Sequence, residues 1–534
     1  MNADFQDSMI SQAVKKLRLI LFLYILLIPF SAGQAASPQV LASLGEKVER
    51  WEVEEAWKEM ENLLKTESRD PQVLEMAAQI AFHRGEYEEA RKFIQSALEI
   101  GGEDEKRRGF SLFIESTLSV LTSFQKHESP HFIIHLDEKQ DGILADYLKD
   151  NLERTYRVMA ERYGFQPKER IRVEVFPDTK AFYLCSTLSA RDIEVAGAVG
   201  LAQFNKLLIL SPRALVYGYR WLDSLSHEYL HYLILKLTAN KAPIWFHEGL
   251  AKYEETRWRS GPSYLNAVSQ TLLAQALARE KLIDWEKMEN SFIKLETPEE
   301  VQLAYAQAAS VIDFILSRAG DRGLQEVMRR MAGGSPPEGA RQAVEQVMGW
   351  PFPEFSEKWK ESLAQKGFKE MDGVHARRYK IKEGKSDEER VEMNEIKSMI
   401  ARNRAHLGDR LKERGRMDAA VLEYRRALAE SRESVPVMNR LSDALIRMNR
   451  APEALNVLKE AGVLAPDHPT IYSYMGKAFI QIQDFSSARG ALEESIQINP
   501  FNPEVHQNLA LAAEKMGDSD TALREKEILR RLVR

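Results

Sequence analysis

At 534 residues the chain is too long for a single hydrophobic core, so we expect several domains. Charged residues make up 29% and hydrophobic residues 44% of the chain, and the net charge is only -6. This balance excludes a polyacidic tail and a strongly basic surface, so we expect no nucleic-acid partner. Because Cys185 is the only cysteine, an intramolecular disulfide is impossible and any metal must be held by His and carboxylate side chains. The surrounding AFYLCSTL favours a packed thiol over a nucleophile.

The first 36 residues have the order of features of a secretory signal sequence. Three basic residues between positions 15 and 18 precede an apolar run over residues 19–30, and small residues follow in SAGQAAS. The apolar run is shorter than the roughly 20 residues that span a bilayer as a helix, which favours cleavage near Ala35 or Ala36. We therefore expect an exported protein of a bacterial-type periplasm or cell envelope. The alternative is an uncleaved segment that associates with the membrane.

Residues 40–125 are predicted to form a short helical-repeat domain. In the segment AFHRGEYEEARKFIQSALEI, Gly85 and Ala90 keep an offset that recurs near the C-terminus. Ala56 lies 34 residues before Ala90. Small residues at such a period are typical of stacked helix pairs, which pack closely at these positions.

The pattern over residues 129–368 predicts an α+β domain with strands first and helices after. HFIIHLD (131–137) and IRVEVFPD (171–178) alternate like strands around a helical stretch over residues 144–163. The segments AVGLAQF and LLILS then flank an Asn-Lys pair in the manner of a hairpin.

The segment SHEYLH carries the motif H-E-x-x-H at His227, Glu228 and His231. On a helix the four-residue step places both imidazoles on one face, so that two nitrogens can reach a single metal ion. Glu228 is turned off this face but can still reach a metal-bound water and accept its proton. Apolar neighbours predict that the helix is buried, where polar side chains need a partner such as a metal.

A catalytic zinc ion usually keeps three protein ligands, so the motif predicts a third ligand farther along the chain. The metzincin pattern would require Gly and His at the positions of Ile234 and Leu237 and is therefore excluded. The next segment, APIWFHEGLAKYEE, indicates a tight turn into a second helix with two candidates, Glu248 and His247. Glu248 lies 17 residues beyond His231, and His247 is expected to leave the helix by the opposite face.

The spelling W-F-H-E-G-L-A, together with the preceding H-E-x-x-H helix, resembles the gluzincins of the peptidase-MA-like domains. The resemblance covers about residues 129–368, and its specific motifs lie on the two helices. It implies a thermolysin-like catalytic domain with one Zn²⁺ per chain, held by His227, His231 and Glu248. It also implies that Glu228 acts as general acid/base in peptide-bond hydrolysis.

Tyrosine and glutamate side chains supply candidates for supporting roles. Tyr305, in LAYAQAAS, is the catalytic candidate for donating to the tetrahedral oxyanion, with core packing as the alternative. Tyr232 and Tyr253 are weaker candidates for the same role. We expect Glu254 and Glu255 to be solvated, with Glu254 as an alternative partner that orients an imidazole.

The resemblance also implies an edge strand that holds the substrate backbone, and residues 197–202 occupy its expected place. A bulge or a plain turn explains the two glycines of this segment equally well. The predicted substrate-binding residues are Gly197, Ala198, Val199 and Gly200.

Residues 369–398 are rich in Lys, Arg, Glu and Asp and are predicted to form a linker, with a solvated helix as the alternative for the second half. Residues 399–534 repeat every 34 residues. The first repeated set is Ala420, Ala454, Ala488 and Ala522. The second set, five residues earlier, is Gly415, Asn449, Gln483 and Gly517. This period resembles that of a tetratricopeptide array, which often accompanies peptidase-MA-like domains.

These patterns together predict an exported zinc metallopeptidase that cleaves polypeptides and recruits protein partners through all-α tetratricopeptide segments on both sides of its catalytic domain. The alternative is a non-catalytic scaffold or assembly factor in which the metallopeptidase-like domain is a relic or a fold stabilised by zinc. The presence of all four predicted metal and base residues argues against a relic. No pattern separates endopeptidase from exopeptidase action or identifies the partner.

Overall fold

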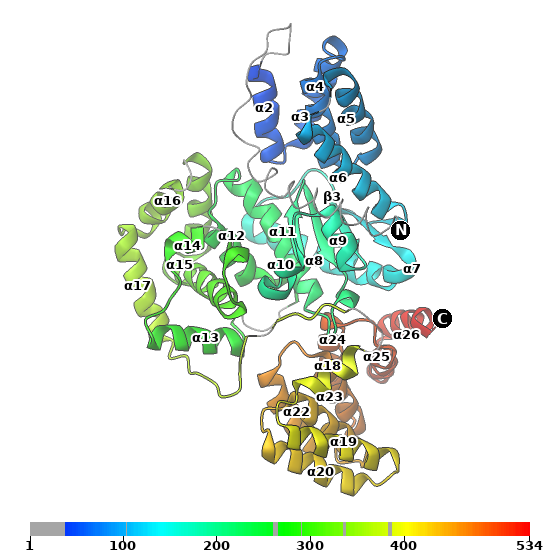
Figure 1. The fold of residues 1–534 in the computed structure, drawn as a ribbon. Helices are drawn as coiled ribbons and strands as arrows, with labels where there is room; N and C mark the ends of the chain where they lie inside the picture. The colour runs from blue at the N-terminus through cyan, green and yellow to red at the C-terminus, as the bar shows by residue number, and fades with distance from the viewer. Residues whose placement is uncertain are drawn as a thin grey trace.

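The computed structural model describes residues 38–102, 104–259, 265–289, 291–334, 338–376, 378–382 and 387–533. The expected signal segment, residues 1–36, lies outside this part of the chain. Among the described helices, none combines the length and the apolar character needed to cross a membrane. The described chain forms an N-terminal repeat segment (blue), a central domain (cyan to green) and a C-terminal array (yellow to red) (Figure 1).

The N-terminal repeat segment is entirely helical. Its second helix pair shows why the sequence folds this way: Asp70 accepts a hydrogen bond from the Gln72 amide, Pro71 opens the helix, and Gly85 ends it in the left-handed conformation. The helices are α2 (Pro38–Glu49), α3 (Val53–Thr66), α4 (Pro71–Arg84), α5 (Tyr87–Gly101) and α6 (Glu105–Leu121).

The central domain begins with a mixed five-stranded sheet whose strand order is β1-β2-β3-β5-β4. The outer pairs β1–β2 and β4–β5 are antiparallel, whereas β2–β3 and β3–β5 are parallel. Phe204 and Asn205 both have positive φ, as expected for a tight two-residue hairpin turn between β4 and β5. The strands are β1 (Phe124–Glu128), β2 (Phe132–Asp137), β3 (Ile171–Phe176), β4 (Gly200–Gln203) and β5 (Lys206–Leu210).

Helices complete the central domain, with α8 and α11 packed against the sheet. The early helices are α7 (Glu138–Asp141), α8 (Ala145–Tyr163), α9 (Thr179–Cys185) and α10 (Ala190–Ala196). The later ones are α11 (Trp221–Thr238), α12 (Ile244–Glu254), α13 (Ala267–Ala278), α14 (Trp285–Glu289), α15 (Pro298–Gly333, broken at Gly320), α16 (Glu338–Met348) and α17 (Phe352–Gln365). Short 3₁₀ turns are η1 (Gly142–Leu144), η2 (Pro212–Ala214), η3 (Arg257–Arg259) and η4 (Phe292–Lys294).

The C-terminal array is a run of helix pairs, with α19 and α20 far from the central domain and α24 close to it (Figure 1). Its helices are α19 (Met399–Glu413), α20 (Met417–Glu430), α21 (Val435–Arg447), α22 (Ala451–Leu464), α23 (Pro469–Gln481), α24 (Phe485–Ile498), α25 (Pro503–Met516) and α26 (Ser519–Val533).

The period of 34 residues has a direct structural cause in the array. The four alanines of the first repeated set are buried between helices. The four residues of the second set all have positive φ, between 59° and 79°, where the first helix of each pair ends. In the N-terminal repeat segment Trp51 and Gly85 take the same left-handed conformation at the same 34-residue step. The sequence period therefore marks one left-handed helix end and one close helix contact per repeat.

Replacing Gln483 with glycine is expected to stabilise the protein. Gln483 is exposed and has a left-handed backbone conformation, at φ 62°, which glycine adopts more easily. This conformation costs an L-residue roughly 1–2 kcal/mol, and the greater backbone entropy of unfolded glycine offsets roughly 0.5–1 kcal/mol. Gln483→Gly should therefore raise the free energy of unfolding by about 0.5–1 kcal/mol in urea titrations. Gly517→Ala, at the equivalent site, should lower it; a fall for Gln483→Gly would contradict this account.

The N-terminal repeat segment is fastened to the central sheet by buried charges. The Lys206 ammonium, which is 1% exposed, donates to the Phe82 carbonyl at 3.0 Å and to the Tyr87 hydroxyl at 2.7 Å. That hydroxyl donates to the buried Glu174 carboxylate, which also accepts from Arg172 Nε at 2.7 Å. Burial lowers the pKa of Lys206 to about 7. Separating the N-terminal repeat segment from the sheet would leave these buried charges without partners, which is strongly destabilising. The N-terminal repeat segment is therefore an integral part of the fold.

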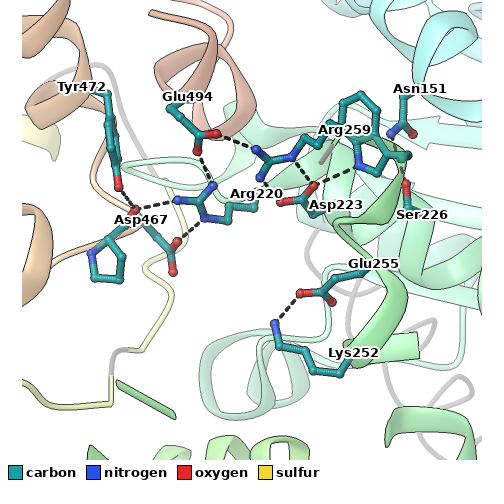
Figure 2. A network of polar contacts seen from close by, with 12 residues as sticks. Asn151, Arg220, Asp223, Ser226, Lys252, Glu255, Arg259, Asp467, Tyr472 and Glu494 are labelled. Carbon is teal, nitrogen blue, oxygen red and sulfur yellow. Dashed lines mark hydrogen bonds and ion pairs between the residues drawn. The ribbon is translucent and has the colours of Figure 1, made fainter. Parts of the chain in front are cut away.

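The C-terminal array docks onto the start of α11. Figure 2 shows Arg220 bound to Asp467 at 2.7 Å and to Glu494 at 2.6 Å, while Arg259 joins Glu494 to Asp223. The Trp221 indole N–H donates to the Ile496 carbonyl at 2.9 Å in the same region. The helix that carries H-E-x-x-H is therefore held at its first turn by the later repeats of the array.

Part of the expected linker has defined structure. Lys380 and Lys382 form main-chain hydrogen bonds with Val216 and Ala214, around an isolated bridge between Ile381 and Leu215. Within the second half of this segment, α18 (Asp387–Glu395) is helical, in agreement with the alternative of a helix. The segment is thus fastened to the central domain just before the α11 helix.

Candidate metal centre

Helix α11 places the H-E-x-x-H motif inside the domain. Most of its residues are buried, and its Ser226 hydroxyl is fully covered. Ser226 accepts a hydrogen bond from the Asn151 amide at 3.1 Å and shares a 2.8 Å hydrogen bond with Thr155, both on α8. These bonds satisfy the polar side chain beside the motif and fix the rotation of α11 against α8.

Helix α12 follows after a short turn, and Gly249 allows α15 to approach it closely. A Cβ atom at Gly249 would lie 2.5 Å from the carbonyl oxygen of Ala308 on α15. The glycine after Glu248 is therefore required by packing. The close approach brings Tyr305 of α15 beside the motif, with its ring centre 6.2 Å from that of His227.

Three predicted ligands converge between α11 and α12. One ligand atom from each of His227, His231 and Glu248 lies within 4.8 Å of the other two. Glu248 Oε2 is 3.2 Å from His227 Nε2 and 3.5 Å from His231 Nε2. The three side chains are mostly covered, and they lie in a cleft whose cavity is about 810 Å³. Within the described part of the chain, these three residues form the group of His, Cys, Asp and Glu side chains that lie close enough together to hold one metal ion.

The protonation of the cluster is set by its neighbours. Burial alone would raise the pKa of Glu248, but the His231 charge and hydrogen bonds from His227 and His231 hold that pKa well below its usual range. Burial alone would lower the pKa of His227, but hydrogen bonds to Glu248 and Glu255 raise it to about 10. The site thus strongly favours positive charge next to the Glu248 carboxylate.

A second carboxylate orients His227, and it is Glu255. Its Oε2 lies 3.0 Å from His227 Nδ1, while Lys252 forms an ion pair with its other oxygen. The expectation that Glu255 is solvated is therefore wrong. Glu254 was likewise expected to be solvated, or else to orient an imidazole; both expectations are wrong, because it is fully buried and pairs with Arg162 at 2.8 Å. The two adjacent glutamates point to different partners because α12 turns by about 100° per residue.

The general-base candidate Glu228 lies against the sheet edge. Its carboxylate accepts a hydrogen bond from the Ala202 backbone, and burial raises its pKa above the ordinary value. A Cβ atom at Gly200 would lie 2.6 Å from Glu228 Oε1. Gly200 is therefore needed because the carboxylate occupies the space that a side chain would fill. No spacing rule along the sequence predicts this contact.

The expected substrate strand is shifted relative to the prediction. The strand β4 begins at Gly200 and forms the outer edge of the sheet beside α11. Gly197 lies outside it, in the left-handed conformation that ends α10. Ala198 and Val199 connect the two elements, and all four predicted residues line the cleft. The two glycines are therefore required for different reasons. Gly197 ends α10 in the left-handed conformation, and Gly200 leaves space for the Glu228 carboxylate.

The three tyrosine candidates differ in position. Tyr305 lines the cleft, and burial, nearby carboxylates and a hydrogen bond to Glu248 raise the pKa of Tyr305 well above its usual value. Tyr232 instead packs against Trp51, and Tyr253 against Arg257. Tyr305 is therefore the candidate hydroxyl next to the cluster.

His247 and Cys185 were the rival functional residues. Contrary to expectation, His247 also faces the cleft, with its ring centre 5.6 Å from that of His231. It is not part of the three-residue cluster, and burial lowers its pKa to about 3, so the ring is neutral. Cys185 is buried, and burial raises its pKa, which agrees with a packed thiol.

The donor set and its spacing fit a zinc ion. Two ligand atoms held about 2.0–2.2 Å from one tetrahedral metal are about 3.3–3.6 Å apart. The contacts of Glu248 with His227 and His231, at 3.2 and 3.5 Å, agree with this spacing. A carboxylate on the far nitrogen of a ligating imidazole is the usual outer support of zinc sites, and Glu255 occupies that position.

Comparison with known families agrees with the division seen in the fold. Residues 155–365 match the family model described as Peptidase MA superfamily. Residues 52–105, 411–478 and 491–524 match tetratricopeptide repeat models. The chain therefore combines a Peptidase MA superfamily domain with tetratricopeptide repeats in both flanking segments.

Similar individual proteins share only short stretches with this chain. The BBSome complex member BBS4 of Bos taurus is 28% identical over 120 residues, which cover 22% of this chain and 23% of the relative. The Mus musculus protein is 27% identical over 117 residues, with 22% of each covered. The chain thus spans less than a quarter of the length of these relatives. The structure of MamA from Desulfovibrio magneticus RS-1 is 20% identical, covers 25% of this chain and 75% of its own, and has a TM-score of 0.24.

Proposed function

We propose that this chain is a zinc-dependent peptidase that hydrolyses peptide bonds in polypeptide substrates. His227, His231 and Glu248 would hold one zinc ion per chain, and Glu228 would act as general base and acid. The observation that carries the proposal is the convergence of two imidazole nitrogens and one carboxylate oxygen within 4.8 Å of one another, in a cleft that also contains Glu228. The match to the Peptidase MA superfamily supports the same class of chemistry.

The chemistry divides between the ion and the side chains around it. A bound zinc ion would supply Lewis acidity toward the scissile carbonyl and the attacking water. Glu228 takes one proton from that water as the water oxygen bonds to the carbonyl carbon. Glu228 then delivers the proton to the amide nitrogen as the C–N bond breaks. The raised pKa of Glu228 suits both steps because the carboxylate then exchanges protons more readily near neutral pH.

Two further groups would position the substrate. The Tyr305 hydroxyl, which stays protonated because its pKa is raised, would donate to the oxygen that becomes negatively charged. Apart from the Ala202 donor, which binds Glu228, the outer edge of β4 carries backbone groups that can pair with an extended substrate as an additional strand. The substrate chain would then lie beside both the cluster and Glu228.

Glu255→Gln is expected to weaken zinc binding by about 10–100-fold, because the neutral amide supports the His227 imidazole less strongly than a carboxylate does. Competition with a chromophoric chelator measures the affinity. Glu460→Gln, at an exposed site on α22, provides the control and should leave zinc affinity unchanged. Equal affinities for the wild type and Glu255→Gln would show that the contact does not support the metal.

Export and partner recruitment are part of the same proposal. The basic, apolar and small-residue order of residues 1–36 supports delivery to a bacterial-type periplasm or cell envelope, where polypeptide substrates would be met. The tetratricopeptide segments support binding of protein partners. Cell fractionation with N-terminal sequencing of the recovered protein tests the export, since a cytoplasmic, uncleaved chain would contradict it.

The decisive experiment combines metal analysis with a cleavage assay. The purified full chain is analysed for zinc and incubated with a fluorescence-quenched unfolded protein, before and after chelation. We expect one zinc per chain and cleavage that stops on chelation and returns when zinc is added. Bound zinc without any cleavage would favour the scaffold alternative instead.

A further inference from the structure

The cleft that contains the metal cluster extends beyond the central domain. Its lining includes His227 and Glu248 on the floor, Trp51 of the N-terminal repeat segment, and Glu433 of the C-terminal array. One cavity of about 810 Å³ is therefore bounded by all three parts of the chain. This volume lies in the upper part of the roughly 300–1,000 Å³ range of ligand pockets.

The array contributes the turns between its repeats to this cleft. Residues 431–434 connect α20 to α21, and residues 465–468 connect α22 to α23; Glu433 and Asp467 are among the residues of these turns that line the cavity. We call these turns the inter-repeat edge. The helix faces that stack repeat against repeat are separate from this edge.

The inter-repeat edge is held in a fixed position over the cleft. Arg220 binds the Pro466 carbonyl at 3.0 Å as well as Asp467 and Glu494 (Figure 2). Farther along the array, the Ile498 carbonyl accepts from the Tyr219 amide at 3.0 Å. The turn at residues 465–468 and the C-terminal end of α24 thus bind the segment that precedes α11, and they position the turn at residues 431–434 over the cavity.

The fastened linker segment forms a further wall. The Tyr379 ring packs over Gly197, where a Cβ atom would lie 2.9 Å from the ring. Gly373 lies against the Glu433 carboxyl group of the first turn, where a Cβ atom would lie 2.5 Å from it. The linker therefore bridges the end of α10 and the array, and it lines the cavity between them.

The chemistry of these walls fits an extended polypeptide. The floor presents apolar side chains and the edge of β4, whose outer backbone groups can bind another strand. The outer walls carry exposed side chains of both signs, including Arg378, Lys397 and Glu433. Nucleic acid would require a mainly basic surface, which this cleft lacks among its described residues.

We propose that a single extended segment of the substrate polypeptide binds the metal-site floor and the inter-repeat edge at the same time. This inference rests on the proposed peptidase function and deepens it, because the array then acts as part of the substrate-binding site. The substrate is an unfolded or locally unfolded polypeptide, since a folded domain could not enter a cleft with walls on several sides. The turn at residues 431–434 binds the part of the substrate segment that extends beyond the metal site.

Photocrosslinking from single positions tests this arrangement without requiring turnover. The zinc-loaded full chain carries Glu228→Gln, so that the probe stays intact, and a benzophenone amino acid replaces one residue at a time. The positions are Leu201 on the β4 edge, Glu433 on the inter-repeat edge and, as control, the exposed Glu460 on the same array. The probe is a reduced and carboxymethylated, fluorescently labelled polypeptide. We expect crosslinks from positions 201 and 433 that excess unlabelled probe suppresses, and none from position 460.

The possible outcomes separate the two proposals. Crosslinking from position 201 without crosslinking from 433 would overturn the inference about the array and leave the proposed peptidase function intact. The absence of crosslinks from both positions would contradict polypeptide binding in the cleft, and therefore both proposals. Equal crosslinking from 433 and 460 would show unspecific contact with the array and would also overturn the inference. Circular dichroism of each benzophenone-containing variant confirms that the variant is folded.

Discussion

Glu228→Gln is expected to reduce the rate of peptide hydrolysis by about 10²–10⁴-fold, because the amide cannot accept the proton of the attacking water or return it to the leaving nitrogen. The replacement has nearly the same shape as the glutamate. It can still accept the hydrogen bond from the Ala202 backbone and fit over Gly200, so the fold should be retained. Initial rates with a quenched unfolded protein measure the effect.

The same variant should keep its zinc, since none of the three proposed ligands is changed. Elemental analysis of the purified protein therefore accompanies the kinetic measurement. Glu194→Gln, an exposed carboxylate on α10 near the cleft, is the matched control and should cleave at the wild-type rate. Wild-type activity in Glu228→Gln that still depends on zinc would rule out the general-base role.

The elements that could be predicted from the sequence are those that depend on local patterns. Alternating apolar residues predicted the central strands, and the Asn-Lys pair predicted the hairpin that joins β4 to β5, although the turn itself is one residue earlier, at Phe204 and Asn205. The 34-residue period predicted the array, because each repeat has the same left-handed helix end and the same buried alanine. Local periodicity identifies such features since the cause and the pattern lie within one or two helices.

The features that could not be predicted depend on contacts between distant residues. Glu255 was expected to be solvated, yet it binds His227, and only the packing angle between α11 and α12 decides which of two adjacent glutamates faces the imidazole. Arg220 meets Asp467 and Glu494 across more than 240 residues of sequence. No spacing rule relates charged side chains at such separations, so the docking of the array had no signal in the single sequence.

Both flanking repeat segments are docked on the central domain. The sequence predicted repeats that recruit protein partners and gave no relation between them and the metal site. In the structure, Lys206 binds the first segment through buried hydrogen bonds, and Arg220 and Trp221 bind the array at the first turn of α11. A partner or substrate bound on the inter-repeat edge would therefore lie in the same cavity as the proposed metal cluster, so that recruitment and cleavage would share one surface.

Glu248→Ala is expected to lower the zinc affinity by about 10²-fold or more, whereas His247→Ala should leave zinc bound. Both side chains face the cleft, so location alone does not separate them. The Glu248 carboxylate contacts both motif imidazoles, at 3.2 and 3.5 Å, whereas His247 is outside the cluster of three. The loss of one ligand from a three-ligand site removes direct coordination, which exceeds the roughly 10–100-fold cost of losing an outer partner.

Zinc content after dialysis against a weak chelator, followed by competitive titration, distinguishes the two residues. His247→Ala also tests the structure in a second way, because its neutral, partly buried ring contributes packing but no charge, so its loss should lower the thermal midpoint without changing the metal stoichiometry. If His247→Ala lost zinc while Glu248→Ala retained it, the third ligand would be the imidazole and the site would no longer be of the gluzincin type. The measured pair of affinities therefore decides both the ligand set and the class of the metal centre.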